Sequence, residues 1–193
     1  RSLIHNNKMT IISLQELAVF LNTYNLSGRV ADYGGTDTIG GKVVEQMLSS
    51  EDVGIKKDTN DNTGIFFVMG SGTKQAAPSY HMLDYDSGID LLKPIPGEKF
   101  DGGLCMDLLE HTSNPFVVAK NISDSLVVGA YLFVTAPFVF EVHNYPGDYW
   151  RFTSQGLSEL FKGMEEVSTK IIRDEAPDEE LERYRVVSVF KKI

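Results

Sequence analysis

The chain has 193 residues and a mass of 21.5 kDa, with 42% apolar and 23% charged side chains. This length and composition predict one folded domain and exclude an intrinsically disordered chain. With 18 basic and 27 acidic residues the formal charge is −9, so we expect no nucleic-acid partner, because such a surface repels phosphate backbones. No apolar stretch approaches the roughly 20 residues of a membrane helix, so we expect no membrane partner.

The cysteine content is typical of a reducing compartment. Cys105 is the single cysteine and cannot form an internal disulfide. No signal-peptide pattern opens the sequence. We therefore expect a cytoplasmic protein.

Helical and extended patterns alternate along the chain. A capping box at residues 13–16 starts the first helix, within an N-terminal helical segment, residues 1–28. The other expected elements are a strand at 29–33, a helix at 39–48, strands at 65–69, 80–83 and 100–106, a helix at 115–126, a strand at 130–136, a helix at 154–161 and strands at 166–172 and 185–190.

This order of elements predicts an α/β fold with a mostly parallel sheet and helices on both faces. No helical pattern separates the two final strands, which predicts an antiparallel end to the sheet. We expect a single domain over residues 1–193, because no linker-like stretch divides it. Residues 51–63 read as a polar loop, and residues 51–79 as an insertion or lid loop.

A glycine-rich turn follows the first strand. Adjacent Gly34 and Gly35 permit positive φ and close approach of a ligand, and ligands of open α/β sheets bind beyond the carboxyl ends of the strands. Thr36 stands where the dinucleotide fingerprint has its second glycine, which disfavours a pyrophosphate. Asp32 and Asp37 would repel a diphosphate, so this turn favours a ligand with an ammonium or sulfonium centre.

Three segments resemble class I S-adenosylmethionine-dependent methyltransferases. Residues 30–36 (Val-Ala-Asp-Tyr-Gly-Gly-Thr) are similar to their first motif, and residues 100–111 to their fourth-strand motif. Residues 143–153, followed by Gly and Leu at 156–157, resemble a subgroup with an Asp-Tyr-Trp-Arg-Phe/Tyr-Thr signature. The resemblance spans residues 30–161. It implies a Rossmann-like sheet of seven strands with an antiparallel last strand, and S-adenosyl-L-methionine as cofactor.

The resemblance also implies a cofactor site along the ends of the first, second and fourth strands. If residues 80–83 form the second strand, Asp84 is the ribose-binding acid, because a carboxylate can accept both ribose hydroxyls. If residues 65–69 form it, no acid stands at its end and Asp84 moves toward the adenine; we favour the first alternative. Thr36 departs from the family, which usually has Gly there. The expected cofactor-binding residues are Asp32, Gly34, Gly35, Thr36, Asp84, Cys105, Met106 and Asp107.

Methyl transfer to a hydroxyl needs a positioned nucleophile and removal of its proton. His143 follows the expected fifth strand, and histidine titrates near neutral pH, so His143 is the expected base. Asp148 and Tyr149 are further catalytic candidates. We expect Trp150 and Arg151 to dock this loop onto the sheet, with Arg151 paired to a carboxylate.

A metal site is an alternative, although we expect none. Asp107, Glu110 and His111 have the spacing of one helical face and could converge on a divalent cation with His143 as fourth ligand. This spacing resembles the Glu-x-x-Glu-His metal site of small-RNA ribose methyltransferases.

Together these features predict a methyltransferase that uses S-adenosylmethionine on a hydroxyl or amine of a small-molecule acceptor, such as a sugar or another natural-product intermediate. One alternative is a non-catalytic module with the same fold that serves binding or assembly in a larger protein. The other is a metal-assisted RNA ribose methyltransferase, against which the acidic composition argues.

Overall fold

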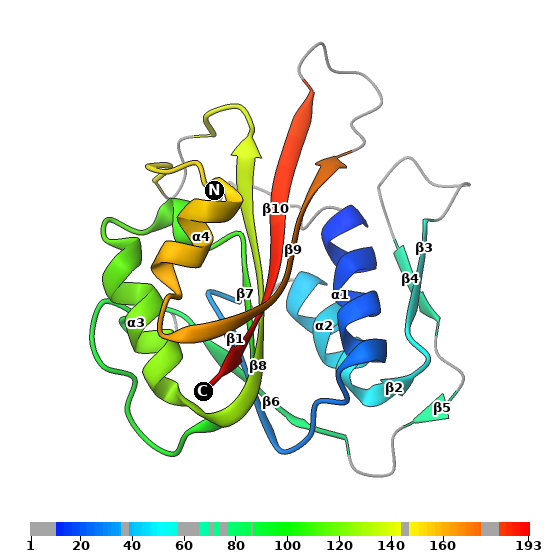
Figure 1. Ribbon diagram of the computed structural model, residues 1–193. Coiled ribbons are helices and arrows are strands. Elements are labelled where there is room, and N and C mark those ends of the chain that lie inside the picture. The colour runs from blue at the N-terminus through cyan, green and yellow to red at the C-terminus, as the bar shows by residue number, and fades with distance from the viewer. Residues whose placement is uncertain are drawn as a thin grey trace, which may run out of the picture.

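A six-stranded mixed sheet forms the centre of the molecule. The computed structural model describes residues 11–35, 39–57, 66–69, 72–73, 77–85, 87–143, 147–174 and 182–193. The strand order is β6-β1-β7-β8-β10-β9 (Figure 1). The first four of these strands are parallel, whereas β10 is antiparallel to both β8 and β9, which confirms the predicted antiparallel end. The strands are β1 (Arg29–Tyr33), β6 (Ser79–Leu83), β7 (Phe100–Met106), β8 (Leu126–Val139), β9 (Met164–Asp174) and β10 (Arg183–Lys192).

Helices lie beside this sheet. In Figure 1, α3 (Pro115–Ser125) and α4 (Ser154–Leu160) lie on one side, and α1 (Ile11–Thr23) and α2 (Ile39–Ser49) on the other. The N-cap residue Asn114 starts α3, because its side chain accepts a hydrogen bond from Val117 N at 3.3 Å. Thr153 caps α4 in the same way, through Gly156 N at 3.0 Å. No helix in the described residues has both the length and the apolar character needed to cross a membrane.

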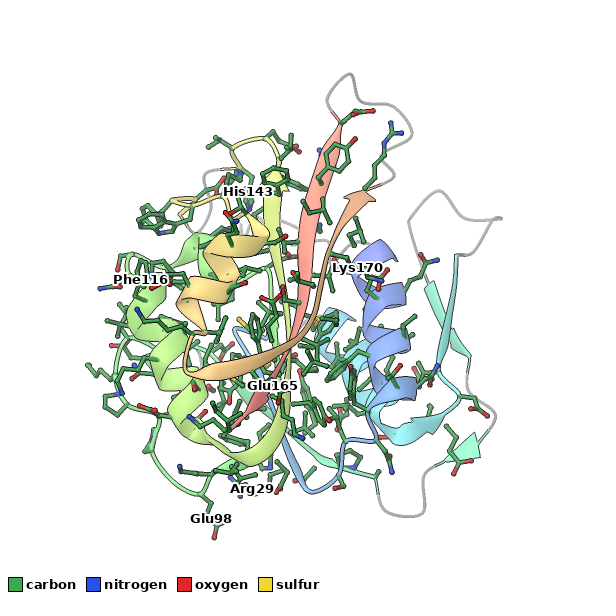
Figure 2. All side chains as sticks on the ribbon, in the orientation of Figure 1. Arg29, Glu98, Phe116, His143, Glu165 and Lys170 are labelled. Carbon is green, nitrogen blue, oxygen red and sulfur yellow. The ribbon has the colours of Figure 1, made fainter. Side chains whose placement is uncertain are left out.

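Alternation along the strands divides the core into two clusters. Val30 packs with α1 and α2, whereas Tyr33 packs with α3 and α4, because neighbouring side chains of a strand point to opposite faces. The Tyr33 hydroxyl meets Ser125 Oγ at 2.6 Å and links the sheet to the end of α3. On the α1 side, Lys170 of β9 pairs with Glu16 at 2.5 Å (Figure 2).

The main sheet has six strands within the described residues, one fewer than expected, because residues 66–69 pair with residues 54–57 in a separate two-stranded sheet. The described residues between 84 and 99 form turns that return the chain from the end of β6 to the start of β7. This stretch contains two prolines, and Gly88 and Gly97 have φ values of +82° and +94°. Such residues disfavour a regular strand, and β6 is therefore an edge of the sheet.

The segment expected as an insertion or lid loop contains a β-hairpin beside α1 (Figure 1). Two antiparallel pairs share one register: β2 (Ser50–Glu51) with β5 (Gly72–Thr73), and β3 (Gly54–Lys57) with β4 (Phe66–Met69). Asn22 of α1 anchors the hairpin, donating to Val53 O at 2.8 Å and accepting from Val53 N at 2.9 Å.

The hairpin settles which segment is the second parallel strand. The expected polar loop at 51–63 is wrong over 54–57, which are extended, and 66–69 pairs only within the hairpin. β6 pairs with β1 in parallel instead, so residues 80–83 supply the second strand, as favoured.

Gly103, at the centre of β7, provides a test of this packing. A Cβ there would lie 2.8 Å from Tyr33 Cε2 and 3.0 Å from Leu132 Cδ1. We expect Gly103→Ala to lower the free energy of unfolding by about 1–3 kcal/mol, the usual cost of overpacking a core. The matched control is Gly163→Ala, where a Cβ would meet no atom within 4 Å. Guanidinium unfolding measures both, and equal losses in the two variants would contradict the packing described.

Candidate functional site

The turn after β1 requires glycine at two positions. Gly34 has φ +76°, and its N–H donates to Leu83 O at 2.8 Å, which ties the turn to the end of β6. A Cβ on Gly34 would lie 2.6 Å from Leu108 Cδ1, and one on Gly35 would lie 2.8 Å from Asp32 Cγ. The carboxyl ends of β1, β6 and β7 therefore meet at this turn. Thr36 lies outside the described residues.

Asp32 is a buried carboxylate beside these glycines. The residue is 2% exposed, and the Tyr80 hydroxyl donates to Asp32 Oδ2 at 2.7 Å. Burial raises the pKa of Asp32 to about 7, and the nearby Asp84 carboxylate contributes in the same direction. Because no cation compensates this charge in the described residues, a cationic ligand group at this carboxylate would favour its ionised form.

Asp84 lies where the sequence placed it, directly after β6. Its Oδ1 accepts from Ser87 N at 2.6 Å, while Ser87 Oγ donates to Asp84 O at 2.7 Å. These bonds close a tight turn that fixes the half-buried acid at the same sheet edge as the glycine turn.

The residues at the end of β7 do not share one environment. Cys105 packs in the core on the α3 and α4 side, where burial raises the pKa of its thiol well above the ordinary value. Met106 packs on the opposite face, in the cluster that contains Val30 and Leu104. Strand alternation therefore places Met106, and not Cys105, on the face of β1 from which Asp32 projects.

Asp107 holds a strained backbone at the end of β7. Its φ is +50°, and its N–H donates to Thr135 O at 3.0 Å. The carboxylate accepts from Thr135 Oγ1 at 3.1 Å and pairs with Arg185 of β10, which is 4% exposed. Arg185 could not be predicted as a partner from the sequence, because only the pairing of β10 with β8 brings it near Asp107.

A compact cluster of Glu110, His111 and His143 lies beside this strained residue. Their ligand atoms all lie within 4.8 Å of one another. Nε2 of His111 lies 3.3 Å from Nε2 of His143 and 3.7 Å from Glu110 Oε1. The structure thus brings together three of the four residues of the alternative metal site, while Asp107 is engaged with Arg185.

Both histidines have a contact at Nδ1, the ring nitrogen that faces away from the cluster. His111 Nδ1 contacts Gly147 O, and His143 Nδ1 lies 2.8 Å from Asp148 Oδ2 as an ion-pair contact without hydrogen-bond geometry. Arg151 Nη2 donates to Asp148 Oδ2 at 2.7 Å, which confirms the expected pairing of Arg151 with a carboxylate. The Arg151 guanidinium holds the pKa of Asp148 well below its usual range. Figure 2 shows His143 near the carboxyl end of β8.

Glu110 is the buried member of the cluster. It is 2% exposed, and its Oε2 atom has no hydrogen-bond partner within the part of the chain that the structure describes. Burial raises the pKa of Glu110 well above its usual range, and Asp107 adds to this effect. An unpaired carboxylate oxygen at this depth costs free energy unless a ligand or proton satisfies it.

The remaining residues of the signature segment fix its position. Tyr149 is 61% exposed, but its backbone N–H donates to Glu110 O at 2.8 Å. The Trp150 indole donates to Thr112 O at 2.9 Å, so it docks the segment onto the residues after β7 and not onto a strand of the sheet. The segment after β8 is therefore bonded directly to the segment after β7.

No protein-family model and no curated protein matches the chain. Among solved structures, it is similar to the N-methyltransferase NodS from Bradyrhizobium japonicum WM9, at TM-score 0.58 and 10% identity over 94% of this chain and 95% of that one. NodS has also been solved in complex with S-adenosyl-L-homocysteine.

Two further structures cover nearly the whole chain. One is a SAM-dependent methyltransferase from Methanosarcina mazei, at TM-score 0.56 and 13% identity over 91% of this chain and 97% of that one. The other is the [4+2]-cyclase SpnF, at TM-score 0.57 and 13% identity over 93% of this chain and 80% of that one. At such identities the likeness shows the fold, which is that of the class I methyltransferases.

The environment of Asp32 predicts a pH-dependent stability. Between about pH 4 and 7 the folded chain retains a proton on Asp32 that the unfolded chain has lost. The contribution of Asp32 to the free energy of unfolding therefore falls as pH rises through this range and levels off above about pH 7. Asp32→Asn keeps an acceptor for Tyr80 but cannot ionise. We expect the wild type to lose up to about 1.4 kcal/mol per pH unit relative to this variant. Urea unfolding at pH 5, 6, 7 and 8 measures the difference, and a constant difference would contradict the assignment.

Proposed function

We propose that the chain is a methyltransferase that uses S-adenosyl-L-methionine to methylate a hydroxyl or amine of a small molecule. The observation that carries the proposal is the buried Asp32 carboxylate beside a glycine turn, at the carboxyl edge of a methyltransferase-like sheet. A buried anion without a compensating cation suits the ammonium group of the cofactor's methionine moiety.

The residues present fit this cofactor. Asp32 and the backbone of Gly34, Gly35 and Thr36 would hold the methionine end, and Asp84 would accept the ribose hydroxyls. Met106 would border the pocket from the face it shares with Asp32, and Asp107 would close the floor through its bond to Arg185. Cys105 supports this wall from the core on the other face. When bound, S-adenosylmethionine supplies an electrophilic methyl group.

The histidine cluster would receive the methyl acceptor. Leu108 contacts the glycine turn, and Glu110 and His111 follow it two and three residues later, so the cluster and the turn are neighbours. The His143 side chain is 30% exposed and can be reached by an acceptor, whose hydroxyl proton it would remove through Nε2. Asp148 would position His143 through Nδ1, and the exposed Tyr149 would border the acceptor.

Binding of S-adenosyl-L-homocysteine tests the cofactor assignment. We expect Asp84→Asn to weaken binding by about tenfold or more, because a carboxylate that bonds two hydroxyls contributes more than 1.4 kcal/mol. Asp90→Asn is the matched control, since Asp90 also caps a backbone N–H, that of Leu92 at 3.0 Å. Isothermal titration calorimetry measures all three proteins. Absence of binding to the wild type at millimolar ligand would refute the cofactor assignment.

Turnover tests the assignment of the base. With any hydroxyl acceptor found by screening, we expect His143→Gln to lower kcat by about 10²–10⁴-fold, the usual contribution of a general base. The dissociation constant for S-adenosyl-L-homocysteine should stay unchanged in this variant. His81→Gln, which removes a histidine of β6 bonded to Ser79, serves as the control. Cofactor binding without turnover of any acceptor would instead support the non-catalytic binding module.

A further inference from the structure

Two of the separations within the histidine cluster match those of ligands on one metal ion, and all three ligand atoms lie within 4.8 Å of one another. Two ligands placed 2.0–2.1 Å from a tetrahedral ion lie about 3.3 Å apart, which is the separation of the two Nε2 atoms. The 3.7 Å between His111 Nε2 and Glu110 Oε1 also fits around one ion. These atoms come from two chain segments, one after β7 and one after β8, that are bonded to each other through Tyr149 N and Glu110 O.

The contacts behind the histidines determine where their protons lie. A carbonyl oxygen only accepts, so the contact with Gly147 O places a proton on His111 Nδ1. The ionised Asp148 carboxylate beside His143 Nδ1 favours a proton there too. Two Nε2 lone pairs that face each other at 3.3 Å repel, and either a shared proton or a bound metal ion between them removes this repulsion.

Glu110 supplies an independent observation. Its Oε2 is buried and has no hydrogen-bond partner in the described residues, although the carboxyl group adjoins both imidazoles. Metal-bound histidines ordinarily donate their second ring N–H to a carbonyl or carboxylate. His111 has such a partner in Gly147 O, and the Asp148 carboxylate lies 2.8 Å from Nδ1 of His143 as an ion-pair contact. The three ligand side chains are therefore assembled, with Gly147 O behind His111 and the Asp148 carboxylate beside His143.

We propose that Glu110, His111 and His143 bind one divalent transition-metal ion, with Zn²⁺ the best match to the donor set. Two imidazoles and one carboxylate suit Zn²⁺, Fe²⁺, Co²⁺ or Ni²⁺ better than Mg²⁺ or Ca²⁺, which prefer oxygen ligands. Three protein ligands leave one coordination position open, as in catalytic metal sites. Asp107 is not a ligand, because it pairs with Arg185.

The ion would change the chemistry of the proposed acceptor site; this consequence rests on the proposed function, whereas the metal site does not. With the ion bound, His143 Nε2 is a ligand and no longer the base. An acceptor hydroxyl at the open position would have a lowered pKa and would lose its proton to solvent water. Methyl transfer would then depend on the metal.

Titration of the chelator-treated, full-length chain with Zn²⁺ tests the site. We expect one ion per chain by calorimetry, a rise in Tm, and a visible absorption band when Co²⁺ is the probe. Glu110→Gln and His143→Gln should each weaken Zn²⁺ binding by about 100-fold or more, since loss of supporting partners alone costs 10–100-fold in such sites. His81→Gln removes a histidine outside the cluster and should bind Zn²⁺ like the wild type.

Three results would overturn the proposal: no stoichiometric binding to the wild type, equal affinities in all four proteins, or equal weakening in His81→Gln. The first would leave the histidine pair sharing a proton only, and the last two would mean that Zn²⁺ binds outside the cluster. Glu110→Gln keeps the shape of the buried group, so the test stands even if circular dichroism shows His143→Gln to be misfolded. S-adenosyl-L-homocysteine binding in the same samples separates failure of the metal site from failure of the proposed function.

Discussion

The structure depends on a single electrostatic constraint, the burial of the Asp32 carboxylate at the end of β1. A carboxylate that is 2% exposed must be hydrogen-bonded, and Tyr80 of the neighbouring β6 meets this need at 2.7 Å. The space around Asp32 leaves no room for a Cβ on Gly35, so the acid also determines the glycine beside it. Its pKa near 7 indicates that the protein retains a group whose ionisation opposes folding, as functional sites commonly do.

A second constraint links this acid to the histidine cluster. The segment after β7 contacts the glycine turn through Leu108 and carries Glu110 and His111 a few residues later. The strained backbone of Asp107 and its buried pair with Arg185 fix where that segment leaves the sheet. The glycine turn and the two histidines are therefore held at neighbouring positions along the carboxyl edge of the sheet.

The fold by itself does not decide the reaction. The similar structures include both an N-methyltransferase and a [4+2]-cyclase, so one architecture supports different chemistry. What distinguishes this chain is the arrangement of charge at the carboxyl edge: two neighbouring acids at the ends of β1 and β6, and a carboxylate with two imidazoles beyond β7 and β8. The two acids suit a cationic ligand. The carboxylate with two imidazoles suits a bound metal ion or the transfer of a proton.

The sequence alone determined the local elements, because hydrophobic periodicity, capping residues and glycine turns act over a few residues. It correctly predicted the antiparallel end of the sheet, favoured residues 80–83 as the second strand, and predicted a carboxylate partner for Arg151. It predicted a polar loop where the hairpin stands and did not separate a core strand from the hairpin strand 66–69, since both are short apolar runs. The partners Tyr80 and Arg185, and the opposite faces of Cys105 and Met106, were decided by the tertiary structure, because strand order and register depend on contacts between residues distant in sequence.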